Sequence, residues 1–98
     1  MTTVGSGSKV IVTVGNRMGL HARPASRLVK MLSDFPGATV TLAREDDPRS
    51  HADCRSILSL IVLAAGQGTR LVLSGSGENA DAAVSKIADF FAVNFDEE

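Results

Sequence analysis

The stretch that separates two hydrophobic patterns reads Gly19-Leu20-His21-Ala22-Arg23-Pro24-Ala25. Before it, Lys9 to Val14 alternate between two faces, one of them strongly apolar, which predicts a β-strand. After it, apolar side chains recur at helical spacing as far as Leu32, which predicts an amphipathic helix of about three turns. Pro24 must lie in the first turn of that helix, because its missing N–H costs no hydrogen bond there. The helix therefore begins close to His21.

The same two periodicities alternate along the rest of the chain. We expect strands at residues 38–42, 50–54 and 70–74, a charged loop at 44–49, and turns at 66–68 and 75–77. Two more helices are expected, one from Ile57 to Ala65 and one from Ala80 to about Asn94. The order β-α-β-β-α-β-α favours an α+β architecture with the helices on one face of an antiparallel sheet. The pattern leaves the strand order open, and a ferredoxin-like fold has nearly the same order of elements.

The chain has 98 residues, which is the length of one small domain. We expect a flexible N-terminal tail at residues 1–8, a domain at 9–94 and an acidic C-terminal tail at 95–98. Ten basic and eleven acidic side chains give a net charge of −1. A charge this even argues against a dedicated binder of nucleic acid or of anionic membranes.

Cysteine usage and hydropathy indicate the compartment. Cys54 is the only cysteine, so no intrachain disulfide can form, which fits a reducing cytosol. The N-terminus shows no signal-peptide pattern, and the longest apolar run, residues 60–65, is far shorter than the ~20 residues that span a bilayer. We therefore expect a soluble, cytoplasmic protein without a membrane insertion, which acts as a monomer.

The start of the first expected helix has the properties of an anion site. Its first N–H groups lack intrahelical partners and carry partial positive charge. Arg23 can fork onto phosphate oxygens, and Gly19 leaves space beside the His21 imidazole. A neutral imidazole nitrogen is a nucleophile near neutral pH. These residues predict that His21 accepts and holds a phosphoryl group; the alternative is a surface histidine chosen for loop geometry.

Other reaction classes lack support. The sequence shows no pair of carboxylates for acid–base hydrolysis and no spacing typical of metal ligands. We therefore predict no metal site.

The segment Asn16-Arg17-Met18-Gly19-Leu20-His21-Ala22-Arg23-Pro24-Ala25-Ser26 closely resembles the active-site signature of the HPr family. These are the histidine-containing phosphocarrier proteins of the phosphoenolpyruvate-dependent phosphotransferase system. Three later segments resemble the family in the same order: Arg55–Leu58 its regulatory-serine segment, Ala65–Thr69 its turn before the fourth strand, and Ala80–Val84 the start of its last helix. The resemblance covers roughly residues 9–94.

The resemblance implies a fold and a reaction. The fold is an HPr-like open-faced β-sandwich, βαββαβα, with a four-stranded antiparallel sheet and three helices on one face. His21 is implied to be phosphorylated at Nδ1, with Arg23 orienting the phosphate and Pro24 shaping the helix start. The implied donor is phospho-enzyme I, and the implied acceptors are IIA domains or proteins of sugar permeases. The resemblance thus implies a phosphoryl carrier rather than a free-standing enzyme, with no cofactor stored in the chain.

Ser56 has two interpretations. Its residue type and place predict an N-cap for the second helix. The resemblance implies a regulatory serine phosphorylated by an HPr kinase/phosphorylase. The sequence departs from the Ser-Ile-Met-Gly run of the family, because Leu58 and Ser59 follow Ile57, and this bears on recognition by the kinase.

A docking surface for partner proteins is expected beside His21. Residues 57–65 hold more apolar side chains than one helix can turn toward a sheet, so some are expected on the surface. The candidates for this surface are Ala22, Arg27, Ile57, Leu58 and Ile61. The alternatives are core positions for the apolar residues and a solvated face for Arg27.

Two other functions stay open from the sequence. A nitrogen-branch or regulatory relay protein would keep the chemistry of His21 but act on a kinase or transcription factor. A silent binding module of the same fold typically lacks the histidine, so the presence of His21 and Arg23 argues against it.

Overall fold

The computed structural model describes residues 8–97, and the other residues of the expected N-terminal tail, together with Glu98, lie outside the described part. The elements are β1 (Ser8–Thr13), α1 (Ala22–Leu32), β2 (Ala38–Arg44), β3 (Asp47–Asp53), α2 (Ile57–Val62), β4 (Arg70–Gly77), α3 (Ala80–Ala92) and the short 3₁₀-helix η1 (Asn94–Asp96). This order confirms the predicted βαββαβα succession. No helix within the described residues is long and apolar enough to cross a membrane.

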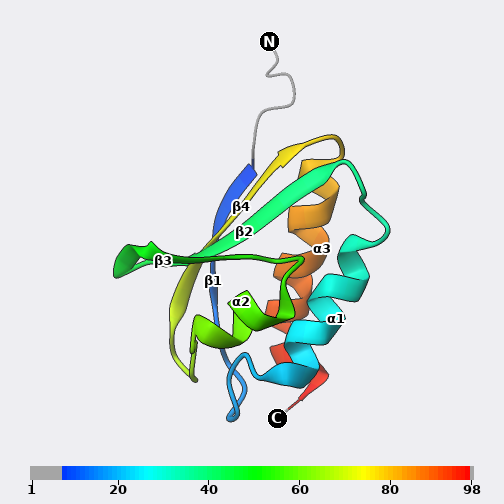
Figure 1. The fold of residues 1–98 in the computed structure, drawn as a ribbon. Helices are drawn as coiled ribbons and strands as arrows, with labels where there is room; N and C mark the ends of the chain where they lie inside the picture. Colours follow the sequence, from blue (N-terminus) through cyan, green and yellow to red (C-terminus); the bar gives the residue numbers. More distant parts are fainter. Residues whose placement is uncertain (1–7, 98) are drawn as a thin grey trace.

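The sheet has the strand order β1-β4-β2-β3, and its three paired interfaces are antiparallel. This order answers the question that the periodicity left open. The three α-helices cover one face of the sheet and leave the other open, as Figure 1 shows. The predicted open-faced α+β fold is confirmed.

The core lies between the sheet and the helices. The strands contribute alternate residues to it, which are Val12, Val40, Leu42, Leu71 and Leu73. The helices contribute stripes at the predicted spacing, which are Ala25, Leu28 and Leu32 from α1 and Ala83, Val84, Ile87 and Phe91 from α3. Each fully buried large aliphatic side chain stabilises the fold by roughly 1.5–3 kcal/mol.

The expected charged loop at residues 44–49 is wrong. The chain reverses through Glu45 and Asp46 alone, and β3 already begins at Asp47. Pro48 therefore lies in a strand, which is possible because β3 is an edge strand with one neighbour and a missing N–H need not break a ladder bond.

The expected turn at residues 75–77 is also wrong, because β4 continues to Gly77. Gly75 pairs with Val40 of β2, and a Cβ on it would come within 2.5 Å of the Val84 side chain. The glycine thus allows α3 to pack closely on the sheet, and the reversal follows at Glu78 and Asn79. A smaller difference is that α2 ends at Val62, before the expected Ala65.

Residues 95–97 differ from the expected acidic tail, because they pack on the domain. Phe95 is only 1% exposed, and its ring lies 5.2 Å from the Phe90 ring and 4.8 Å from the Phe91 ring. The chain bends here through left-handed φ angles of 53°, 58° and 59° at Asn94, Phe95 and Asp96. Each of these three residues costs about 1–2 kcal/mol, and the burial and ring contacts of Phe95 offset part of this total.

Candidate functional site

His21 is the N-cap of α1, as predicted. Its backbone is extended, its carbonyl accepts the Ala25 N–H at 3.0 Å, and its side chain makes no capping hydrogen bond. Pro24 is buried in the first turn. The imidazole is therefore held at the end of the helix where the unpaired N–H groups point, and it is not used to cap them.

Gly19 has a different role from the one expected. It adopts a φ of +72°, and a Cβ there would lie 2.6 Å from the carbonyl oxygen of Ala65. The next residue, Leu20, donates its N–H to that same carbonyl at 2.9 Å. Glycine thus permits close contact between the loop before α1 and the loop after α2. This contact holds the segment that carries His21 in position.

The His21 ring lies in an open pocket at the start of α1. The pocket is lined by Arg17, Met18, His21, Ala22, Arg23, Asp96 and Glu97. Arg23 is exposed, and within residues 8–97 its guanidinium has no hydrogen-bond or ion-pair partner. A guanidinium without a partner beside a helix N-terminus can bind an anion.

Glu97 contacts the ring directly. Its two carboxylate oxygens lie 3.0 and 3.1 Å from Nε2 of His21. The hydrogen bond with His21 lowers the pKa of Glu97; partial burial opposes this, and a hydrogen bond from Asn16 and the positive charge of Arg23 add to it. Glu97 is therefore ionised at neutral pH.

Asn16 holds Glu97 in place. It is completely buried, and its Nδ2 donates to Oε1 of Glu97 and to the carbonyl of Gly19, each at 2.8 Å. Its Oδ1 has no hydrogen-bond partner in the described part of the chain. An orphaned buried acceptor costs about 1–3 kcal/mol, and such a group in a native fold calls for an explanation.

Sequence reasoning assigned no role to Asn16 or Glu97. A signal existed for Glu97, because Phe95 follows Phe91 at helical spacing and indicates that the chain end packs on the core. Asn16 begins the segment that resembles the family signature, but its contact with Glu97, 81 positions away in the chain, could not be predicted from it.

Arg27, a predicted docking residue, contacts the C-terminal segment. Its Nη1 donates to the carbonyl of Phe95 at 3.3 Å and lies 4.0 Å from the carboxylate of Asp96. Arg27 therefore ties the C-terminal segment to α1, although its side chain remains 48% exposed.

The predicted N-cap role of Ser56 is confirmed, because its hydroxyl accepts the Ser59 N–H at 3.1 Å. The apolar side chains of α2 divide as expected, with Leu60 buried and four others exposed, which are Ile57, Leu58, Ile61 and Val62. None of these four lines the pocket of His21. Leu58 and Val62 instead line a groove with residues 49–51 of β3.

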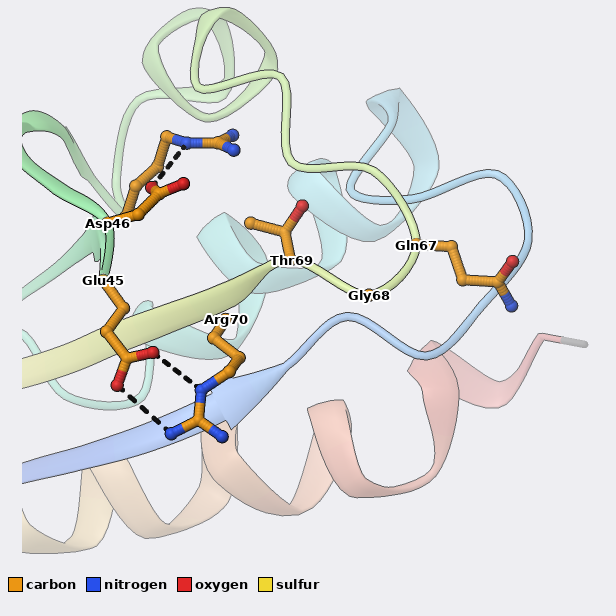
Figure 2. Close-up of a pocket in the computed structure, with 7 residues that line it drawn as sticks. Glu45, Asp46, Gln67, Gly68, Thr69 and Arg70 are labelled. Atoms are coloured by element: carbon orange, nitrogen blue, oxygen red, sulfur yellow. Dashed lines mark hydrogen bonds and ion pairs between the residues drawn. The ribbon is translucent and has the colours of Figure 1, made fainter.

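A second pocket, at the β2–β3 turn, is shown in Figure 2. Arg70 donates to both carboxylate oxygens of Glu45 at 2.7 and 3.1 Å, which lowers the pKa of Glu45. Arg44 pairs with Asp46 at 3.3 Å. Because each of these arginines already has a carboxylate partner, this pocket is a poor anion site.

Comparison with known proteins assigns the chain to a family. The family profile described as "PTS HPr component phosphorylation site" matches residues 8–93. Two relatives are phosphocarrier protein NPr of Shewanella violacea, 38% identical over 88% of this chain and 90% of the relative, and phosphocarrier protein HPr of Pseudomonas aeruginosa, 37% identical over 88% and 92%.

A solved structure agrees with these relatives. It is that of HPr-C-His from Thermoanaerobacter tengcongensis, with a TM-score of 0.81 and 27% identity, covering 93% of this chain and 98% of that one. The family relationship supports a phosphoryl-carrier role with enzymes of the phosphotransferase system. The fold and the matches over most of its length establish that the chain belongs to the HPr family of phosphocarrier proteins.

Proposed function

We propose that His21 is the residue that carries the phosphoryl group, through its Nδ1 nitrogen. The observation that supports this most directly is the position of the ring at the N-terminus of α1, beside Arg23, whose guanidinium has no partner among residues 8–97. The aligned helix dipoles stabilise a nearby anion by about 0.3–1 kcal/mol, and by more where the geometry is partly buried. Imidazole and anion site thus occur together in one pocket.

From this protein, the reaction requires only a nucleophile and groups that bind the negatively charged phosphate oxygens. The Nδ1 lone pair attacks the phosphorus of the donor's phosphohistidine, the donor P–N bond breaks, and the donor nitrogen keeps the electron pair. Arg23 and the free N–H groups of α1 receive the phosphate oxygens, while the partner protein supplies the in-line alignment. The same step in the opposite sense delivers the group to an acceptor.

The partners follow from the family role. We propose phospho-enzyme I as donor and a IIA domain of a sugar permease as acceptor. A nitrogen-branch or regulatory circuit is the second candidate, because the relatives named NPr and HPr are 38% and 37% identical to this chain and support both circuits almost equally.

The test is labelling with radioactive phosphoenolpyruvate and enzyme I. We expect label that is labile in acid, stable in alkali and absent from His21→Ala. His51→Ala is the matched control, since His51 is the second histidine and lies exposed on β3. Label that survives in His21→Ala, or no labelling of the wild type by a host-matched enzyme I, contradicts the assignment.

Arg23→Ala tests the anion site separately. We expect slower transfer without complete loss, since the helix N-terminus remains. An unchanged rate removes Arg23 from the site. Enzyme I of the sugar system and its nitrogen-branch counterpart, compared as donors, distinguish the two circuits by their rates.

The roles of Ser56 and of the exposed side chains of α2 remain predictions. Phosphorylation of Ser56 is tested with HPr kinase/phosphorylase and ATP, with Ser56→Ala as the negative control. The docking role of α2 is tested by Leu58→Ser, for which we expect slower transfer from enzyme I with an unchanged fold.

A further inference from the structure

The contact between Glu97 and His21 fixes where the ring proton lies. A carboxylate can only accept a hydrogen bond, so a ring nitrogen 3.0 and 3.1 Å from its two oxygens must carry the proton. In a neutral imidazole, the other nitrogen is then the one with the free lone pair. The geometry therefore favours the tautomer with Nε2–H and an unprotonated Nδ1.

Asn16 holds the carboxylate in this position. Both partners of its Nδ2, the Gly19 carbonyl and Glu97 Oε1, are acceptors, so the amide must face them with its NH₂ group. The consequence is the orphaned Oδ1 on the other side. The fold tolerates this buried acceptor, which indicates that the two donated bonds matter at this position.

The main chain also directs Glu97 toward the ring. The left-handed run at residues 94–96 bends the chain back after α3, and the buried Phe95 anchors it. Arg27 holds the Phe95 carbonyl from α1. Glu97 thus follows directly on a segment fixed at two points, and its side chain is only 18% exposed.

We propose that Glu97, held by Asn16, is a positioning residue that keeps the proton of His21 on Nε2 and so makes Nδ1 the nucleophile. The inference rests on the proposed function of His21. In the transfer step, Nδ1 forms the bond to phosphorus, the donor nitrogen leaves with its electron pair, and the Nε2 proton stays in place. The ring gains positive charge, which the Glu97 carboxylate balances.

The direct test is ¹⁵N NMR of the ring nitrogens at mildly alkaline pH. In the wild type we expect the ¹⁵N shifts of His21 to show a protonated Nε2 and an unprotonated Nδ1. The difference between the two shifts should be larger in His21 than in His51. His51 is exposed and serves as the internal reference for an unrestrained ring. In Glu97→Gln, the His21 shifts should move toward those of His51, because a Gln side chain can also donate.

The kinetic test compares Glu97→Gln with Glu78→Gln, which removes a carboxylate in the turn between β4 and α3, next to Gly37. We expect roughly tenfold slower phosphoryl acceptance for Glu97→Gln, the usual effect of losing one hydrogen bond to a charged group, and wild-type acceptance for Glu78→Gln.

Three results overturn the proposal: equal tautomer signatures for His21 and His51 in the wild type, no change of the His21 signature in Glu97→Gln, or a changed signature with an unchanged rate. Failure of the proposed function is a different result. The wild type then accepts no label at His21, while the NMR comparison still shows whether Glu97 sets the tautomer.

Discussion

The substitution Phe95→Ala tests whether the end of the chain is part of the fold. The phenyl ring is 1% exposed and contacts the rings of Phe90 and Phe91. Burial of such a ring contributes ~1.5–3 kcal/mol, and each aromatic contact adds ~0.5–1.5 kcal/mol. Alanine keeps the left-handed backbone at this position, so the substitution relieves no strain.

We therefore expect the free energy of unfolding to fall by about 3–4 kcal/mol, within the usual range for Phe→Ala in a core. A domain of this size has about 5–15 kcal/mol in total. The midpoint of thermal unfolding should accordingly drop by ~12–32 °C. The change is large because the ring supports both the core and the path of the chain toward His21.

Equilibrium unfolding in urea measures the change, with the slope compared between variants. Val93→Ala is the matched control, because Val93 is 54% exposed two positions earlier, and its effect should stay within about 0.5 kcal/mol. A loss below about 1 kcal/mol for Phe95→Ala would refute the reasoning, since a ring packed as described cannot be removed at so small a cost.

Three further predictions follow from single contacts. Gly19→Ala should destabilise the fold by about 1–3 kcal/mol in urea unfolding, because it combines a φ of +72° with a contact of 2.6 Å to the Ala65 carbonyl; Gly66→Ala, which meets no atom within 4 Å, should be nearly neutral. Burial, and to a lesser extent Asp53, raises the pKa of Cys54 to about 12, so a maleimide should label the native protein only as fast as it unfolds; rapid labelling contradicts this. The lowered pKa of Glu97 means that its stabilising effect is present above the ordinary value of 4.5 and is lost as pH falls through the lower folded value. The difference in unfolding free energy between wild type and Glu97→Gln should therefore shrink on acidification, and a difference that grows refutes the link.

The fold could be predicted where a residue pattern is typical of only one local structure. The apolar stripe of α1 and the proline in its first turn gave the correct helix start, because both depend on local geometry alone. The glycines of β4 are compatible with two structures, a turn or a strand that is packed closely against a helix. A run of Gly75, Ser76 and Gly77 is typical of a turn, but Gly75 is required by contact with Val84, a neighbour that only the folded chain provides.

The prediction of a charged loop after β2 was wrong for a related reason. Its polar composition and Pro48 are typical of a loop, yet an edge strand tolerates both, because one side of it faces solvent. Strand position within a sheet is a tertiary property. Local composition could not show that β3 lies at the edge.

The residues of the candidate site also fall into two groups, those that the local sequence brings together and those that only the fold brings together. His21, Arg23 and Gly19 lie within five consecutive positions, so their proximity followed from the helix start. Asn16 and Glu97 meet only because the chain bends back after α3, and an acidic chain end is more typical of a solvated tail.

The charges around His21 suit its proposed role, in which the ring must release the phosphoryl group that it accepts. Two arginines, Arg17 and Arg23, line the pocket together with two carboxylates, Asp96 and Glu97. Arginines alone would favour the bound phosphoryl group and slow its departure, since tight binding of the ground state does not help the next transfer. Glu97 lies on the Nε2 side of the ring, where under the proposed mechanism it would stabilise the charge of the phosphorylated ring without blocking Nδ1. Removing this carboxylate should therefore affect acceptance and release together, whereas loss of Arg23 should weaken mainly the hold on the phosphate oxygens.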